Sequence, residues 1–399
     1  MVEEVRKQFN ASFTPERYRA LLDDLKEVLG EEVTFRVAET PFFVPDLLTQ
    51  RMQQACDDIC DVITSDEYYA LSEAAIPPHQ RVPGNDRRPD ILIADFAVCL
   101  DEKGDPMPQL IEMQGFPSLF AYQLILDEAY RRHFDIATDF TPYLNGYTRD
   151  SFYALMHEVF LNGHDPKQVI LLEIEPDKQK TRADFQATEK LYGIRAVCIS
   201  KLIREGKKLF YDRDGVKTEI KRIYNRVIFD ELEQRPELIG DFSMLEEIEA
   251  EWVSHPNWFF RMSKFSLPYF KSPYIPETHF VHTLQQLPPD LENWVLKPLY
   301  SFAGMGVNIH VQPGDIEALE RPEHFILQRK VKYEPVLQAP DAKIKVEIRM
   351  MLFWPQSAPK PVLVTNLCRL SRGELIGVRY NKDFEWVGSS GAYFRQSTR

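Results

Sequence analysis

Basic residues are in short supply in this sequence. Of 399 residues, 48 are Lys or Arg and 61 are Asp or Glu, which gives a formal net charge of −13 at pH 7. A surface this acidic argues against broad binding to nucleic acid or to anionic membranes, because both need clustered basic charge. We therefore expect neither as a partner. A local basic pocket for a phosphate ligand remains compatible with this charge.

Long apolar runs are absent, and cysteine and glycine are few. No run approaches the roughly 20 apolar residues of a membrane span, and the N-terminal MVEEVRKQFN has no signal-peptide core. The five cysteines have no framework spacing, which is typical of a reduced, cytoplasmic protein. Cys56 and Cys60 are best interpreted as two small core residues, with a redox pair or metal site as the alternative. Because there are only 17 glycines, each glycine cluster is informative.

What is present is a globular composition, with 44% apolar and 27% charged residues. The length suggests two or three domains. Apolar periodicity predicts helices at 14–29, 44–64, 118–135 and 229–254. A strand–helix–strand pattern from VILLEIEP to IRAVCIS predicts a parallel sheet, and an Asp-Gly turn lies within a hairpin at 208–227. Further strands are predicted at 91–114, 294–311, 325–331, 345–353 and 362–370.

Three oxygen-bearing side chains share one face of a predicted hairpin at 90–117. Antiparallel pairing across a turn at 101–108 places Asp95 opposite Gln114, with Glu112 on the same face. Such oxygens suit Mg²⁺, which takes one or two carboxylates together with substrate phosphates. Within the apolar stretch LIEM an unpaired Glu112 would be costly. A solvated polar face is the alternative interpretation.

A lysine followed by a glycine-rich loop is the second candidate site. The segment 293–311, NWVLKPLYSFAGMGVNIHV, places Lys297 on a short strand before Ala303, Gly304 and Gly306. Glycine lets the backbone approach a ligand and point N–H groups at an anion, and lysine adds a positive charge for phosphate. The lysine precedes the glycines, so this is not a Walker A loop. An ordinary turn is the alternative.

Two further segments are less specific by themselves. Lys264 opens a helix-like stretch before the letters IPET, and alone it is typical of a surface lysine. The strand FILQRKVKYEPV turns from apolar to polar and reaches Glu334. Its backbone amides suit an adenine edge and its carboxylate suits ribose hydroxyls. A charged edge strand is the alternative.

Two arginines lie in apolar strands near the C-terminus. Glu347 and Arg349 share one face of KVEIRMMLFW, and Arg369 lies in VTNLCRLSRG. A buried arginine needs an anion, which is either a paired carboxylate or a phosphate. The pattern therefore leaves open a structural salt bridge and a phosphate contact.

The order of these segments resembles the ATP-grasp superfamily, in particular its glutathione-synthetase-like members. The family pattern of a lysine near iPxT, a second lysine in vvKP, a glycine-rich loop, a Q…E hinge and an arginine strand corresponds here to Lys264 with IPET, VLKP with SFAGMG, LQRKVKYE, and EIR with NLCRL. The family's D…E-x-N-x-x-P signature matches DFAVCLDEKGDPMPQLIEMQGFP, but this match precedes the other segments and has Gln114 in place of Asn. This order is a circular permutation and is similar to that of glutathionylspermidine-synthase-like proteins.

The resemblance implies an α+β protein with α/β parts, built as a two-lobed ATP-grasp fold plus a Rossmann-like domain. It divides the chain into 1–125, with N-terminal helices and the permuted metal-binding part, 126–250, the Rossmann-like domain, and 251–399, the nucleotide-binding lobes. It implies an ATP-dependent ligase that joins a carboxylate to an amine or thiol through an acylphosphate. The substrates would be small molecules or peptides.

The resemblance also implies roles for the candidate residues, with ATP and Mg²⁺ as cofactors. It assigns Mg²⁺ binding to Asp95, Glu112 and Gln114, and stabilisation of the acylphosphate to Arg349 or Arg369. The residues implied to bind the nucleotide are Lys264, Lys297, Ala303, Gly304, Gly306, Gln328, Arg329, Lys330, Val331 and Glu334.

Two other functions fit the same residues. Gln114 in place of Asn is consistent with a catalytically degenerate ATP-binding protein. A small-molecule kinase of ATP-grasp type would leave a stable phosphorylated product. The identities of the substrates and the oligomeric state are not specified by the sequence.

Overall fold

The computed structural model describes most of the chain, and two of the residues implied to bind nucleotide, Ala303 and Gly304, lie outside the described part. The described residues are 1–238, 240–300, 305–373, 376, 381 and 384–396.

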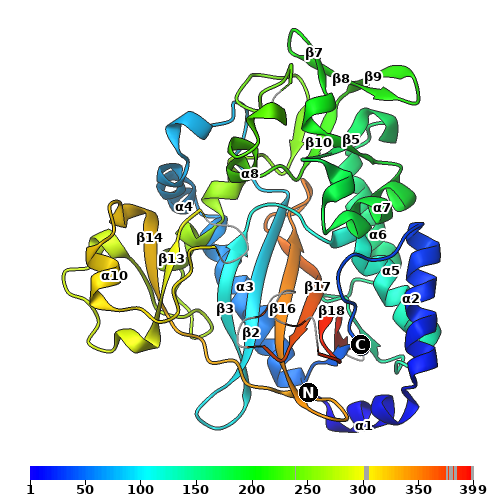
Figure 1. The fold of residues 1–399 in the computed structure, drawn as a ribbon, viewed down its shortest axis with the longest axis vertical. Helices are drawn as coiled ribbons and strands as arrows, with labels where there is room; N and C mark the ends of the chain where they lie inside the picture. Colours follow the sequence, from blue (N-terminus) through cyan, green and yellow to red (C-terminus); the bar gives the residue numbers. More distant parts are fainter. Residues whose placement is uncertain (239, 301–304, 374–375, 377–380, 382–383, 397–399) are drawn as a thin grey trace.

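A six-stranded sheet, here the central sheet, occupies the middle of the molecule (Figure 1). Its spatial order is β18-β17-β16-β2-β3, with β15 paired to β16, and every pairing is antiparallel. Two distant parts of the chain build it, because the early hairpin β2–β3 pairs directly with the C-terminal strands. The strands are β2 (Ile91–Leu100), β3 (Pro106–Gln114), β15 (Leu337–Gln338), β16 (Lys343–Phe353), β17 (Val362–Ser371) and β18 (Gly388–Ser390).

The pairing of β2 with β3 differs from the predicted register. Asp95 pairs with Glu112 rather than Gln114, because the turn is shorter than predicted and the register shifts at a β-bulge. The bulge leaves Ile111 as an extra residue on β3. Leu110, before the bulge, and Met113, after it, are consequently both buried on one face of the sheet. Glu112 lies on the opposite face with Asp95.

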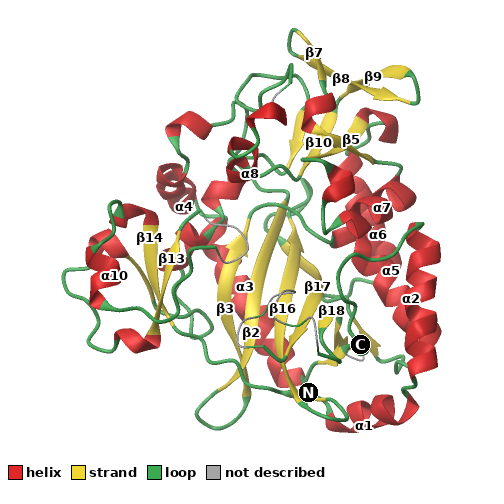
Figure 2. Ribbon diagram, viewed as in Figure 1, coloured by secondary structure: helices red, strands yellow, loops and turns green. Residues whose placement is uncertain are grey.

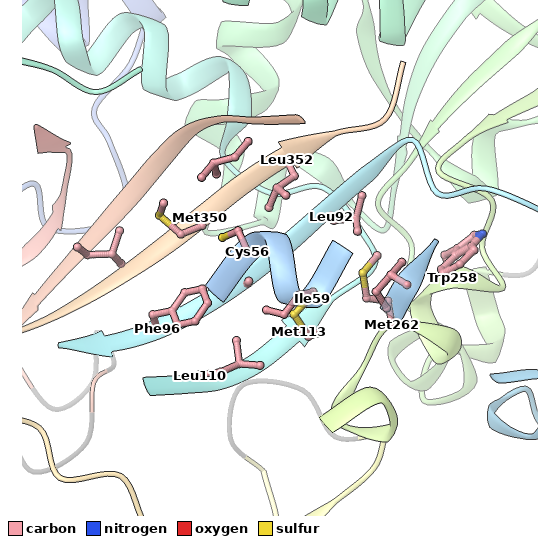
Figure 3. Close-up of a cluster of buried hydrophobic side chains, with 14 of the residues drawn as sticks. Cys56, Ile59, Leu92, Phe96, Leu110, Met113, Trp258, Met262, Met350 and Leu352 are labelled. Carbon is pink, nitrogen blue, oxygen red and sulfur yellow. The ribbon is translucent and has the colours of Figure 1, made fainter. Parts of the chain in front are cut away.

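The apolar face of the central sheet packs against α3 (Asp46–Ile63). Figure 3 shows Cys56 and Ile59 of this helix among side chains from β2, β3 and β16. Cys56 and Cys60 are both buried free thiols, as predicted for core residues.

The opposite face of the central sheet is divided into two halves. At one end Phe353 packs against Phe120 and Phe152, with ring centroids 5.1 and 6.0 Å away. At the other end the same face carries charged side chains around Asp95. The covering helices form a column on one side of the sheet (Figure 2). They are α1 (Glu3–Ser12), α2 (Pro15–Leu29), α5 (Phe120–His133), α6 (Arg149–Leu161) and α7 (Arg182–Tyr192).

A four-stranded parallel sheet with order β11-β10-β5-β6 lies beyond these helices and confirms the predicted strand–helix–strand unit. The predicted hairpin is also present, with Asp214 and Gly215 at its turn in left-handed conformations. The strands are β5 (Val169–Glu173), β6 (Arg195–Cys198), β10 (Arg222–Asn225) and β11 (Glu251–Val253), and the β-meander is β7 (Ile203–Glu205), β8 (Lys208–Arg213) and β9 (Val216–Ile220).

The long helix predicted for 229–254 is wrong. Among the residues described there, α8 (Phe229–Glu233) is the only α-helix, and strand β11 lies near the end of the segment. Pro236 lacks an N–H for a helix interior, and pairing of Trp252 with Ile223 of β10 outweighs the local acidic periodicity.

A three-stranded sheet, here the small sheet, stands beside β3 (Figure 1). Its outer face packs Leu296 and Leu327 into a separate apolar core, and its inner face carries Lys297 and Gln328. Its elements are β12 (Thr278–Phe280), β13 (Trp294–Pro298), β14 (Phe325–Arg329) and the adjoining α10 (Pro313–Glu317).

The remaining elements are short. Within the described ranges, no helix has the length and apolar character needed to cross a membrane. A further three-stranded sheet consists of β1 (Phe42–Phe43), β4 (Phe140–Thr141) and β19 (Ala392–Arg395). Two short helices are α4 (Asp66–Leu71) and α9 (Trp258–Arg261).

Leu352→Ala tests the packing of α3 on the central sheet. Leu352 is 3% exposed, so truncation should lower the free energy of unfolding by about 2–5 kcal/mol. The matched variant Leu71→Ala, at a residue 43% exposed, should change it by less than about 0.5 kcal/mol. Chemical denaturation measures both, and equal effects would contradict the packing described.

Candidate functional site

Asp95 is the centre of the charged half of the central sheet. Its side chain accepts two hydrogen bonds of 2.7 Å from Arg349 on β16 and one of 2.6 Å from Arg369 on β17. Asp95 is fully buried, and burial alone would raise its pKa. The two guanidinium groups outweigh burial and hold that pKa below its ordinary value. Both arginines therefore form the carboxylate pairs that were one of the two sequence interpretations.

Glu347 shares Arg369 with Asp95. Its carboxylate lies 2.8 Å from the Arg369 guanidinium and accepts a 2.7 Å hydrogen bond from the Tyr333 hydroxyl. Burial raises the pKa of Glu347, and the nearby charge of Asp95 adds to that rise, although Arg369 opposes it. Arg369 is the more accessible of the two arginines, with 31% of its side chain exposed against 7% for Arg349.

Glu112 and Gln114 lie beside this ion-pair network, as the shared-face prediction requires. The Gln114 amide donates to Asp95 at 3.2 Å and to Glu112 at 3.0 Å. Both Glu112 and Gln114 are only partly buried, so they remain accessible to a ligand. The structure thus brings the three predicted Mg²⁺ ligands together.

Lys297 joins the small sheet to the central sheet. Its ammonium group donates to the carbonyl of Ile111, the bulge residue of β3, at 3.0 Å and to Gln328 Oε1 at 2.5 Å. Burial lowers the pKa of Lys297 to about 8, with the charge of Glu112 opposing this and that of Lys264 reinforcing it. A buried lysine with this pKa is a strong candidate for a functional group.

Lys264 lies in the same electrostatic cluster. It begins a 3₁₀-helix, Lys264–Tyr269, which packs on β3 and places Phe265 against Phe280 of the small sheet. Burial lowers the pKa of Lys264, while Glu112 and Asp230 raise it. The surface-lysine interpretation is therefore wrong, because Lys264 is 6% exposed.

The side chains of the predicted adenosine-binding strand point in two directions. Gln328 faces Lys297, whereas Arg329 pairs with Asp290 at 2.6 Å on the outer side of the small sheet. Lys330 donates to the Glu292 carbonyl at 2.6 Å. The side chains of these two residues therefore do not join Gln328.

The rest of that segment returns toward the central sheet. The backbone N–H of Arg329 and that of Lys330 are bonded to protein carbonyls, at 2.8 and 2.7 Å. The N–H of Glu334 points to the Val98 carbonyl of β2 at 3.3 Å, and Val331 is partly buried. Gly306 has φ +70 and lies against Pro298, so a side chain there would be strained.

Two residues of this site lacked a clear sequence signal. Tyr333 and Asp230 were not predicted, because each is brought in by a loop or a short helix from elsewhere in the fold. Glu347 was noted as sharing a face with Arg349 but had no role assigned. Asn381 Oδ1 accepts hydrogen bonds from the backbone N–H groups of Arg372 and Gly373, so it stabilises that turn.

The oxygen donors around Asp95 determine which kind of Mg²⁺ site these residues could form. Among the described residues no group of three or more His, Cys, Asp or Glu side chains is placed to hold a metal. Glu112 and Gln114 nevertheless fit the smaller donor set that Mg²⁺ uses when phosphates supply the other ligands. Asp95 has its oxygens committed to Arg349 and Arg369 in this arrangement.

The fold has a counterpart among solved structures. A glutathione synthetase-like effector from Globodera pallida, solved in its apo form, matches with a TM-score of 0.56 and 11% sequence identity, over 96% of this chain and 99% of that chain. At this identity the likeness shows the fold alone, a mixture of helices and several sheets. No protein-family model and no curated protein sequence matches the chain.

Asp95→Asn tests the ion-pair network. Leaving Arg349 and Arg369 without their shared anion should lower the free energy of unfolding by about 3–5 kcal/mol at neutral pH. The pKa of Asp95 is depressed, so its contribution is present above the unfolded value of about 3.9 and lost as pH falls through the folded value. The difference from wild type should therefore shrink in acid.

Asp57→Asn is the control for this experiment. Asp57 makes only a 3.7 Å exposed pair with Lys360, so its loss should cost at most about 1 kcal/mol. Denaturation at a series of pH values measures both variants. A cost for Asp95→Asn no larger than that for Asp57→Asn would contradict the network.

Proposed function

We propose that the protein is an ATP-dependent ligase that joins a carboxylate to an amine or thiol. The observation that carries this proposal is the convergence of Lys297 and Lys264 on Glu112 beside the Asp95–Arg369 network. Phosphoryl transfer needs positive charge and positioning rather than covalent help from the protein. The glutathione synthetase-like fold supports the same class of reaction.

Cations on the two sheets have distinct proposed tasks. Lys297 and Lys264 neutralise ATP phosphates, because both ammonium groups are desolvated and lie near one carboxylate. Arg369 stabilises the charge of the acylphosphate, since part of its side chain is exposed and its Nε has no partner in the described residues. Arg349, with both its hydrogen bonds on Asp95, is the structural partner.

Glu112 and Gln114, with Asp95 beside them, would hold Mg²⁺, which would supply charge neutralisation to the ATP phosphates. Gln328 fixes the Lys297 ammonium. We assign adenosine binding to the segment from Gln328 through Val331 to Glu334. The substrate carboxylate attacks the γ-phosphorus, the bond from that phosphorus to the bridging oxygen breaks, and ADP leaves, which gives an acylphosphate. The amine or thiol then attacks the acyl carbon and loses a proton, and inorganic phosphate leaves.

A second function has one observation in its favour. Asp95 carries three guanidinium hydrogen bonds, which suits a nucleotide-binding protein that does not ligate. The two functions differ in product. Incubation with ATP, Mg²⁺ and pools of amino acids, peptides and polyamines, followed by mass spectrometry, should yield ADP, phosphate and a condensed product. ATP binding with no turnover in any pool would favour the second function.

Lys297→Met tests the nucleotide site directly. We expect a Mg²⁺-dependent thermal shift with ATP over GTP in wild type, corresponding to about 2.7 kcal/mol at a hundred times the dissociation constant. Lys297→Met should lose this shift because a desolvated cation is removed. Lys208→Met, on the β-meander far from these residues in the chain, should keep it. Equal shifts in both variants would contradict the assignment.

The pH dependence of ATP binding should report Lys297. Its pKa is lowered to about 8, so it loses its proton as pH rises through that value. Above that pH the ATP affinity of wild type should fall by about tenfold for each pH unit. The ATP affinity of Lys297→Arg should not show this additional fall, because its guanidinium stays charged. Titration calorimetry between pH 7 and 9.5 measures this, and parallel curves would rule Lys297 out as the titrating group.

A further inference from the structure

The segment from Gly115 to Leu119 is held in an unusually confined position. It follows Gln114 directly and leads into α5. A Cβ on Gly115 would lie 1.9 Å from the Trp258 carbonyl oxygen, so the backbone passes against α9 with no room for a side chain. Leu119 has φ +63, a left-handed conformation that a branched residue seldom adopts. Such a conformation persists only where surrounding contacts impose it.

Asp184 on α7 makes some of these surrounding contacts. Its carboxylate accepts the backbone N–H of Leu119 at 2.9 Å and that of Tyr122 at 3.0 Å. Asp184 is fully buried, so it caps the start of α5 from inside the protein. The downstream end of the segment is therefore anchored to the helix that links β5 and β6.

The upstream end is held by Arg226, which follows β10. Its guanidinium donates to the Pro117 carbonyl and, at 3.2 Å, to Thr181 Oγ1. It also lies 5.6 Å from the ring centroids of Phe116 and Phe185. Arg226 is 7% exposed, so these contacts are formed away from solvent.

A carboxylate behind Arg226 completes the arrangement. Glu173, at the end of β5, lies 3.5 Å from Arg226 Nε and accepts the N–H of Ile174 at 2.8 Å. The planar guanidinium can bond in two directions while its faces stack on aromatic rings, which a lysine cannot do. The Arg226 side chain, directly after β10 of the parallel sheet, thus holds the segment that follows the proposed Mg²⁺ ligands.

We propose that Arg226 is a positioning residue, which fixes segment 115–117 and thereby holds Glu112 and Gln114 for Mg²⁺-dependent nucleotide binding. This inference rests on the proposed function. It differs from a purely structural role because the effect should be selective for the Mg²⁺-dependent part of affinity. Supports behind metal ligands typically alter metal affinity by about 10–100-fold when lost.

Arg226→Met and Arg222→Met form a matched pair for the test. Both arginines are buried on the same chain segment, but Arg222 lies at the opposite end of β10 and bonds to Glu251 and the carbonyls of α6. Both variants lose a buried cation, so general destabilisation is common to them. Only Arg226→Met should release the segment that follows Gln114.

Two measurements are made on the full chain. The first is ATP affinity with and without Mg²⁺. Arg226→Met should lose about tenfold or more of the gain that Mg²⁺ confers while keeping Mg²⁺-free affinity, and Arg222→Met should keep both. The second is hydrogen exchange of the peptide spanning 115–122, which should speed up in Arg226→Met alone. Wild-type values in Arg226→Met, or equal changes in both variants, would overturn the proposal.

The Mg²⁺-dependent affinity of wild type separates this inference from the proposed function. If wild type shows no Mg²⁺-dependent affinity, the proposed function fails and the role of Arg226 in metal-dependent binding fails with it, whatever the exchange shows. If wild type shows the gain and Arg226→Met retains it, only the inference fails. Phe116→Leu removes one stacking ring and replaces Arg226→Met if that variant does not fold. The same outcomes then apply.

Discussion

The carboxylate of Asp95 is the constraint on which the charged half of the central sheet depends. It lies on β2 and receives guanidinium groups from β16 and β17, so three strands share one buried anion. Removing charges from water is costly, and each of these groups is tolerable only because the others are present. Under the proposed function, a ligand phosphate would have to compete with Asp95 and Glu347 for Arg369, which would favour strongly anionic groups.

The small sheet supplies the complementary half. Its inner face brings Lys297 to the bulge of β3, while Lys264 arrives on a separate 3₁₀-helix. These cations are concentrated in a chain whose net charge is −13. The overall charge repels polyanions in general, and under the proposed function this local cluster would bind one compact anion.

Local patterns predicted much of this fold from the sequence. The helix predicted at 14–29 is α2, which Thr14 and Gly30 cap, and the apolar runs around β5 and β6 predicted a parallel unit. These predictions succeeded because caps and buried strands are encoded within a few residues. The domain boundaries at 125 and 250 stay predictions, although the pairing of β2 with β16 joins the first segment to the last.

Features set by distant contacts were not predictable in the same way. The register of β2 and β3 depends on the bulge at Ile111. The carbonyl of Ile111 accepts a hydrogen bond from Lys297, which lies far along the chain. Tyr333 lies within the predicted segment LQRKVKYE, but its contact with Glu347 depends on how that segment returns to the central sheet. The metal and nucleotide roles of the site residues likewise stay predictions, since residue type and proximity do not by themselves establish a bound ligand.

The bulge at Ile111 has a consequence for how this protein tolerates change in length. A strand alternates its side chains with a period of two, and the extra residue resets that phase once, between Leu110 and Glu112. Deleting Ile111 would leave Leu110 and Met113 toward α3 and Glu112 beside Asp95, but it would remove the carbonyl that accepts a hydrogen bond from Lys297. The turn at 101–105 is free of this restriction, because it lies outside the paired residues. Natural variation in length should therefore accumulate at residues 101–105 and be rare from Leu110 to Gln114.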